Sequence, residues 1–405
     1  MTLTIALCFV AALFDGLDIV APGLVAPQLV ADFHLDPQLV GRLFSSSTVG
    51  LLLGALYGGW SADRVGRKRV LIASMIIFGL MSLVTAFATT TPLLFVGRFL
   101  TGLGLGGALP NLIALSAEAG PAHRRTTLVT LMYSGVPLGG ALGGAITLWL
   151  GAADNWRILF YVGGVGPVIL AACLAYFLPE SKLYQQAKSE RAGAVSAQSG
   201  IRSNWSSALF GGGVARTTLL LWVAFFCTLL ILYLLVNWLP LLFVNAGYSR
   251  REAAVATIVF NIGGGLGAML LGSLMDRMRR HVVMFVSFVG MAAALIALLV
   301  AFRSSGVALS VAATAAFAVG VFVIGTQLAL YGISPNYYPT AVRGTGVGAA
   351  VAAGRVGSIV GPLVAGTLLG AGGNAASVLT ALLPVVAVAG MAAVLLLNRP
   401  VPRET

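Results

Sequence analysis

The stretch Gly58-Gly59-Trp60-Ser61-Ala62-Asp63-Arg64-Val65-Gly66-Arg67-Lys68-Arg69 separates two apolar segments, and a shorter version, Gly272-Ser273-Leu274-Met275-Asp276-Arg277-Met278-Arg279-Arg280, recurs later in the chain. Both copies contain an Asp-Arg step followed by further basic residues. A second echo pairs Gly135-Val136-Pro137-Leu138-Gly139-Gly140 with Gly357-Ser358-Ile359-Val360-Gly361-Pro362. These repeats predict a fold of two similar halves.

The composition indicates a membrane protein. Of 405 residues, 59% are hydrophobic and 9% are charged, whereas a soluble domain carries about 25% charged residues. The chain also contains 51 glycines, and small residues let membrane helices approach one another closely. So many apolar residues exceed what one soluble core would bury.

Charged clusters divide the chain into twelve apolar segments, each long enough to cross a hydrocarbon core of about 30 Å. We therefore expect an all-α polytopic membrane protein with twelve transmembrane helices, the first being a retained helix and not a signal peptide. The longest connection divides the predicted domains into a six-helix bundle at 1–178, a cytoplasmic linker at 179–217 and a second six-helix bundle at 218–405. The predicted spans are about 3–25, 42–60, 70–88, 93–114, 126–148, 157–178, 218–243, 253–274, 283–302, 307–333, 344–369 and 375–397.

The net charge of +12 would suit a nucleic-acid partner, but most basic residues lie in connections that share one side of the predicted membrane. This bias places both termini in the cytoplasm, and we expect no nucleic acid. Cys8, Cys173 and Cys227 fall in apolar segments without ligand spacing, so no metal or cofactor is expected. The absence of a nucleophile elbow or phosphate loop argues against an enzyme.

The first copy of the repeated motif resembles, residue for residue, the loop motif of the major facilitator superfamily, and the resemblance extends over nearly the whole chain. This resemblance implies two pseudo-symmetric bundles that rock against each other, with the motif as a cytoplasmic latch. A plain basic loop is the alternative, but it explains the basic residues and not Asp63 with Gly66. The gating residues so implied are Gly59, Asp63, Arg64, Gly66 and Arg67, followed by Lys68 and Arg69, with Asp276 and Arg277 in the second copy, which lacks the Gly and Lys positions.

A narrower resemblance, to the aromatic acid:proton symporters, is based on Asp15-Gly16-Leu17-Asp18, on the stretch from Gly97 to Asn111, on Asn237-Trp238-Leu239-Pro240 and on the stretch from Tyr338 to Gly346. Within that family the chain looks most like the permeases for 3-(3-hydroxyphenyl)propionate. The resemblance implies an importer of small aromatic carboxylates with protons, in a bacterial cytoplasmic membrane. We expect it to act as a monomer. An importer of another organic anion, a proton-coupled efflux protein and a non-transporting sensor are the alternatives.

Asp15 and Asp18 lie inside the first apolar segment. An ionised Asp at the centre of a membrane helix costs roughly 2.5 to 3.5 kcal/mol, so such residues usually face a cavity, a partner charge or a proton path. At positions i and i+3 the two carboxylates share one helix face, and we expect one of them to bind a proton near neutral pH. The sequence does not decide which of the two carries it.

Arg98 and Arg355 are the predicted ligands of an acidic substrate, one from each half. Asp18, Arg98 and Arg355 lie roughly 22, 21 and 17 Å from the cytoplasmic ends of their helices at about 1.5 Å per residue. An Arg fork matches a carboxylate bidentately and stays charged when buried. Alternatively, Arg98 is a static partner of Asp18; if both readings hold, protonation of Asp18 frees Arg98 for the substrate.

An aromatic substrate needs apolar walls with a few orienting polar groups. Aromatic residues at helical spacing are often packing residues instead, and Trp238 near a helix end also suits an interfacial anchor. The predicted substrate contacts from this set are Tyr133, Phe225, Tyr233, Trp238, Gln327 and Tyr331.

Overall fold

The computed structural model describes residues 2–121, 125–150, 155–181, 184–185, 209–211, 214–304, 306–338 and 342–398, with the side chains of residues 2, 125, 126 and 276 left out. Most of the predicted linker at 179–217 therefore lies outside the described residues. Within these ranges twelve helical spans are long and apolar enough to cross a membrane, which confirms the all-α, twelve-span prediction.

The elements are α1 (Thr2–Leu24), α2 (Ala26–Phe33), α3 (Pro37–Val65), α4 (Arg67–Ala86), α5 (Thr91–Glu118), α6 (Arg125–Tyr133), α7 (Gly135–Trp149), α8 (Arg157–Phe177), α11 (Ala215–Asn245), α12 (Arg250–Arg277), α13 (Arg280–Arg303), α14 (Leu309–Ile333), the 3₁₀ turn η2 (Ser334–Tyr337), α15 (Arg343–Gly370) and α16 (Ala375–Leu397).

The repeated motif is a helix corner, and our expectation of a loop from Gly58 to Arg69 was wrong. Asp63 and Arg64 belong to the last turn of α3, and α4 begins at Arg67. Gly66 alone separates the two helices, with φ at +109°, a conformation that side chains with a Cβ rarely adopt. The motif glycine therefore allows the chain to reverse within one residue.

The second copy turns differently. Asp276 and Arg277 end α12, and α13 begins at Arg280 after Met278 and Arg279, both of which have extended backbone. Without a glycine at this place, two extended residues make the connection. The repeat thus keeps the helix–corner–helix arrangement but not its tight turn.

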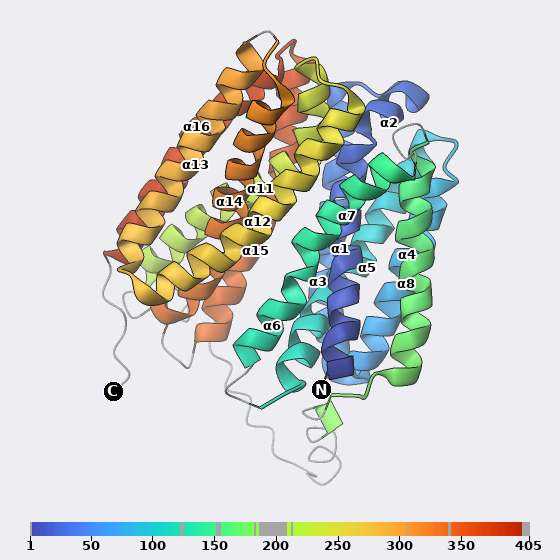
Figure 1. The fold of residues 1–405 in the computed structure, drawn as a ribbon. Helices are drawn as coiled ribbons and strands as arrows, with labels where there is room; N and C mark the ends of the chain where they lie inside the picture. The colour runs from blue at the N-terminus through green and yellow to red at the C-terminus, as the bar shows by residue number, and fades with distance from the viewer. Residues whose placement is uncertain are drawn as a thin grey trace. The chain divides into compact units, whose positions relative to one another are not determined.

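Packing divides the chain into two units. The first contains Met1–His34 with Ser46–Ile201, and the second contains Leu35–Ser45 with Arg202–Thr405. In the first unit α1 packs against α7 and α8, and α4 packs against α5 and α8. The long helices α1, α4, α5 and α8 run side by side in Figure 1.

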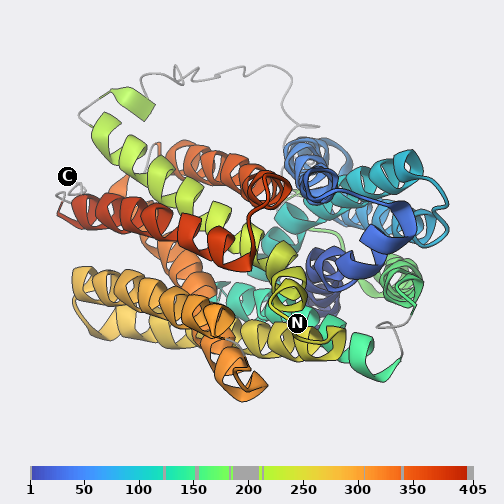
Figure 2. The same ribbon diagram turned by 90° about the horizontal axis from the view of Figure 1, so that it is seen from above.

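The second unit repeats this pattern, and Figure 2 shows the helices of the chain turned by 90°. Its helix α11 packs against α15 and α16, while α13 packs against α14 and α16. The segment Leu35–Ser45, which includes the start of α3, belongs to this unit: the Ser45 hydroxyl donates to the Ile359 carbonyl on α15 (2.7 Å). Hydropathy did not indicate that α3 would be shared between units.

One predicted span is interrupted. The span Thr127–Trp149 consists of α6 and α7, which meet at Ser134. Pro137 has no backbone N–H to donate to the carbonyl four residues earlier, at Tyr133. The missing hydrogen bond accounts for the break just before α7.

Candidate functional site

Asp18 on α1 and Arg98 on α5 form a bidentate ion pair. The two terminal guanidinium nitrogens of Arg98 donate to Asp18 Oδ1 and Oδ2 at 2.7 and 2.9 Å. The exposed fractions of the two side chains are only 1% and 2%. The helix positions predicted similar depths for these residues, and the structure places them in direct contact.

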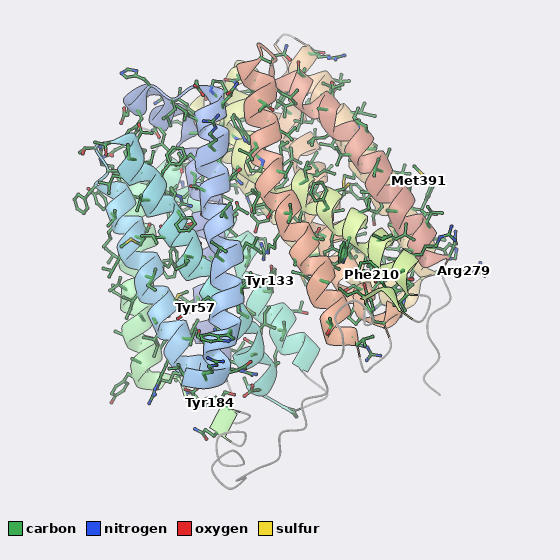
Figure 3. The ribbon with its side chains drawn as sticks, turned by 180° about the vertical axis from the view of Figure 1, so that it is seen from behind. Tyr57, Tyr133, Tyr184, Phe210, Arg279 and Met391 are labelled. Carbon is green, nitrogen blue, oxygen red and sulfur yellow. The ribbon has the colours of Figure 1, made fainter. Side chains whose placement is uncertain are left out.

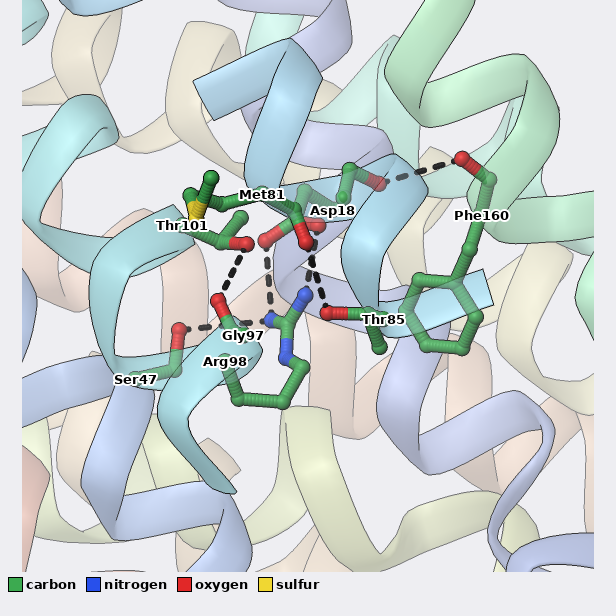
Figure 4. Close-up of polar contacts among 9 residues, drawn as sticks. Asp18, Ser47, Met81, Thr85, Gly97, Arg98, Thr101 and Phe160 are labelled. Carbon is green, nitrogen blue, oxygen red and sulfur yellow. Dashed lines mark hydrogen bonds and ion pairs between the residues drawn. The ribbon is translucent and has the colours of Figure 1, made fainter. Parts of the chain in front are cut away.

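The surroundings of this pair come from two further helices (Figure 4). Ser47 on α3 accepts a third hydrogen bond from Arg98, at 3.3 Å. The guanidinium carbon lies 5.6 Å from the centre of the Phe160 ring on α8. Four helices of the first unit therefore enclose one buried charge pair, with an aromatic ring on one side.

The hydroxyl groups of Thr101 and Thr85 donate to carbonyls of their own helices. Thr101 donates to the Gly97 carbonyl at 2.7 Å and Thr85 to the Met81 carbonyl at 2.9 Å. Arg98 Nε has no hydrogen-bond partner among the described residues. The guanidinium therefore keeps one N–H available for a further acceptor.

Asp15 lies one turn before Asp18 on α1 and is also buried, with 7% of its surface exposed. The first unit thus holds two buried carboxylates, of which Asp18 has the Arg98 partner. Proton coupling through either carboxylate stays a prediction.

In the second unit, Arg355 on α15 reaches Tyr233 on α11. Its guanidinium donates to the Tyr233 hydroxyl oxygen at 2.8 Å, and 8% of the Arg355 surface is exposed. Gly354 and Gly357 flank this arginine and let α15 lie against the α11 backbone: a Cβ on Gly357 would overlap the Phe226 carbonyl oxygen. The close approach of these helices brings the guanidinium within reach of Tyr233.

Helix α14 adds two of the predicted residues to this cluster. Tyr331 has polar interactions with Arg355, Tyr233 and Gln327. The Phe225 ring from α11 stands edge-on to Tyr331, with centroids 5.1 Å apart and an interplanar angle of 78°. Five residues predicted from sequence as substrate contacts therefore gather in one place, which we call the C-terminal cluster: Phe225, Tyr233, Gln327, Tyr331 and Arg355.

Trp238 and Tyr133 lie in different surroundings. Trp238 is fully buried, donates its indole N–H to the Pro362 carbonyl at 3.1 Å and packs edge-on against Phe44. These contacts favour a packing role over a substrate contact or an interfacial anchor. Tyr133, labelled in Figure 3, is half-buried and packs on the apolar core of the first unit.

At the α3–α4 corner, Arg67 of the repeated motif is tied to α5. It forms an ion pair with Glu118 at the end of that helix, and the Ser181 hydroxyl donates to the other Glu118 oxygen at 2.7 Å. Glu118 thus joins the motif to the chain that follows α8.

Glu180 holds the same corner from the other side. Its carboxylate accepts hydrogen bonds from the backbone N–H groups of Lys68 and Ser181, each at 2.9 Å. Tyr184 donates its hydroxyl to the Arg64 carbonyl at 3.0 Å, and Figure 3 shows it at this end of the unit. We did not predict Glu180 or Ser181, because the sequence does not show that the chain returns to the motif after α8.

The remaining motif residues lie at the surface. Asp63 and Arg64 are exposed, and the Arg64 guanidinium stacks 3.8 Å from the centre of the Trp60 ring. Gly59 has open space around it. Arg277 is exposed, while the side chain of Asp276 lies outside the described residues. The gating role of these residues stays a prediction.

Comparison with known proteins identifies the family. The sequence model of the Major Facilitator Superfamily matches residues 8–255 and 242–405. The 3-(3-hydroxy-phenyl)propionate transporter of Escherichia coli K12 is 43% identical over 399 residues, covering 98% of this chain and 94% of the relative. The 4-hydroxybenzoate transporter PcaK of Pseudomonas aeruginosa is 38% identical, covering 97% and 91%. A gallate transporter of Pseudomonas putida is 36% identical, covering 91% and 86%.

A solved structure shows the same fold. The crystal structure of a D-xylose-proton symporter matches with a TM-score of 0.77 at 20% identity, covering 98% of this chain and 97% of that one. At this identity the likeness concerns the fold alone. From the match of the family model and the identity to full-length relatives, the chain belongs to the Major Facilitator Superfamily.

Proposed function

We propose that this chain imports small aromatic carboxylates together with protons across a bacterial cytoplasmic membrane, as a monomer with both termini in the cytoplasm. The buried pair of Asp18 and Arg98 is the observation that carries the proposal. Charges inside a membrane protein are expensive and usually belong to substrate or ion pathways. The aromatic acids named for the relatives supply the substrate class.

The pair supports a simple coupling step. A proton that binds the Asp18 carboxylate removes its negative charge and weakens both hydrogen bonds from Arg98. The guanidinium then keeps its positive charge without a counter-ion, in a place where an uncompensated charge is costly. A substrate carboxylate relieves that cost, so proton and acid bind together more favourably than either alone.

Arg355 in the second unit is a further candidate for recognition of the acid. Its guanidinium already bonds a phenolic oxygen, that of Tyr233, and Phe225 and Tyr331 place aromatic surface beside it. A cation next to aromatic rings suits a ligand that is an anion at one end and apolar at the other. We assign Arg355 to substrate recognition.

The α3–α4 corner suits a latch at the cytoplasmic ends of the helices. Glu118 and Glu180 hold Arg67 and the start of α4 in place. Such polar contacts at a helix end form and break at modest cost. We propose that this network stabilises one state of the transport cycle.

Uptake into proteoliposomes under an imposed pH gradient, alkaline inside, tests the function. Radiolabelled benzoate, 4-hydroxybenzoate, cinnamate and 3-phenylpropionate are compared with succinate, and protein-free liposomes correct for passive entry of the weak acids. We expect uphill accumulation of aromatic acids that a protonophore abolishes. Accumulation of succinate alone indicates another anion importer, and expulsion of acid along the opposite gradient indicates efflux. Uptake equal to that of empty liposomes rejects transport.

A further inference from the structure

Gln327 on α14 has a buried amide whose hydrogen bonds are unmade. Only 2% of its surface is exposed, and neither Oε1 nor Nε2 has a hydrogen-bond partner among the described residues. Tyr331, one turn further along α14, is the polar neighbour of this amide on the same helix. Buried polar groups are nearly always satisfied in native proteins. An amide left in this state needs an explanation other than packing.

The position of Gln327 in the C-terminal cluster supplies one. Tyr331 interacts with both Gln327 and Arg355, so the amide and the guanidinium are neighbours of the same aromatic residue.

The chemistry of the amide selects the ligand group. A glutamine amide offers two N–H donors and a carbonyl acceptor. A carboxylate has acceptors only and would leave Oε1 unsatisfied, whereas an unsubstituted ring edge satisfies neither atom. A hydroxyl both donates and accepts, and it can therefore bond Oε1 and Nε2.

We infer that Gln327 binds a ring hydroxyl of the substrate whose carboxylate Arg355 holds, so that the transporter selects phenolic acids over their unsubstituted counterparts. This inference rests on the proposed function. Phe225 and Tyr331 provide aromatic surface in the same cluster. Sites built to hydrogen-bond a substrate hydroxyl reject analogues that lack it, because the polar groups of the site then stay unpaired.

Equilibrium binding to the purified full-length protein in lipid nanodiscs tests this inference. Two pairs of acids differ by one hydroxyl: 3-(3-hydroxyphenyl)propionate with 3-phenylpropionate, and 4-hydroxybenzoate with benzoate. For at least one pair, we expect the wild type to bind the phenolic acid roughly 10- to 100-fold more tightly, the factor that corresponds to one unsatisfied buried polar group. Gln327→Met, which keeps the length of the side chain without its polar atoms, brings the ratio near one by weakening the phenolic acid alone. Ser287→Ala is the control, because the Ser287 hydroxyl bonds only its own helix, at Val283, and it keeps the ratio.

Each other outcome decides against the inference. An unchanged ratio in Gln327→Met shows that the amide does not bind the hydroxyl. Equal loss of affinity for both acids shows that the amide binds the carboxylate or has a packing role. Thermal unfolding of the ligand-free variant adds a second reading: a fall in Tm larger than that of Ser287→Ala reveals a partner for the amide within the protein and also overturns the inference. If the wild type binds none of the four acids, the proposed function itself fails. If the wild type binds them and the ratio of affinities is the same in Gln327→Met, only the inference fails.

Discussion

Arg98 and Asp18, which are 80 residues apart in sequence and almost fully buried, form a bidentate ion pair with hydrogen bonds of 2.7 and 2.9 Å. Removing one partner of a buried pair leaves the other as an uncompensated charge, and this typically costs about 3–5 kcal/mol. The geometry therefore predicts strong energetic coupling between the two positions as well as a role in transport.

A double-mutant cycle measures that coupling. We expect Asp18→Asn and Arg98→Gln each to lower the free energy of unfolding by about 3–5 kcal/mol, and the double variant to lose clearly less than the sum, because neither charge is then stranded. Unfolding of the purified variants, followed by circular dichroism, supplies the values. Additive losses would mean that the two residues act independently.

Asp18→Asn also tests proton coupling. Asparagine keeps the shape of the side chain but cannot exchange a proton, so we expect uphill uptake driven by a pH gradient to disappear while exchange of labelled for unlabelled acid persists. Both rates are normalised to the amount of inserted protein. Asp15→Asn, studied in parallel, shows which carboxylate carries the proton. Full uphill uptake by Asp18→Asn would remove that residue from the coupling mechanism.

Arg355→Lys tests carboxylate recognition. A lysine ammonium is a point charge that cannot reproduce the bidentate fork of arginine, and we expect the half-saturation concentration to rise roughly tenfold or more, corresponding to at least about 1.4 kcal/mol. Tyr233→Phe removes the hydroxyl that Arg355 bonds and should have a smaller effect in the same direction. An unchanged half-saturation concentration in Arg355→Lys would reassign the arginine to packing.

Gly357→Ala tests the close contact of α15 with α11. The added methyl group would overlap the Phe226 carbonyl oxygen, and overpacking of this kind costs about 1–3 kcal/mol. Gly348→Ala on the same helix is the matched control, since nothing lies near its Cβ position and alanine favours a helix over glycine by about 1 kcal/mol. Thermal unfolding should separate the two variants. Equal Tm values would contradict the tight packing of these helices.

Tyr338→Phe tests a buried hydroxyl between η2 and α15. Tyr338 donates to Thr218 Oγ1 at 3.1 Å, and burial raises the pKa of its phenol above 10.0, the hydrogen bond to Thr218 opposing this in part. Because the folded state holds this proton more tightly than the unfolded chain, the contribution of Tyr338 is complete below about pH 10 and falls as the pH rises through the raised pKa. At neutral pH we expect the free energy of unfolding of the wild type to exceed that of Tyr338→Phe by about 0.5–1.5 kcal/mol.

The pH dependence of that difference is the measurement. We measure the free energy of unfolding of both proteins between pH 7 and pH 11. The difference between them should become smaller at the alkaline end, and the titration of the other tyrosines cancels because both proteins contain them. A difference that stays constant to pH 11 would show that the phenol has the same pKa in the folded and unfolded states and is therefore not buried in solution.

The membrane explains why so much of the fold was predictable. In a bilayer every backbone polar group must be satisfied within the segment, so an apolar stretch of sufficient length becomes a helix. The twelve predicted spans agree with the observed ones within a few residues. The differences occur at charged ends such as Asp63 and Arg64, where α3 continues beyond the apolar segment.

The C-terminal cluster was predictable as residue types but not as an arrangement. Tyr233, Gln327 and Arg355 were selected because polar and aromatic groups in apolar helices suit a binding site. The same reasoning selected Trp238, whose indole hydrogen bond to Pro362 favours a packing role. Helices that are apolar on every side have no amphipathic face from which their rotation can be read.

By itself, the sequence determined the helical class, the twelve spans, the duplicated halves and the buried charges, because length, hydropathy and repetition are properties of single segments. Only the tertiary structure decided which charge meets which partner: Asp18 with Arg98, Arg355 with Tyr233, and Glu180 with the start of α4. It also assigned Leu35–Ser45 to the second unit. These pairings depend on the rotation and close approach of helices, which side-chain packing sets across long separations in sequence.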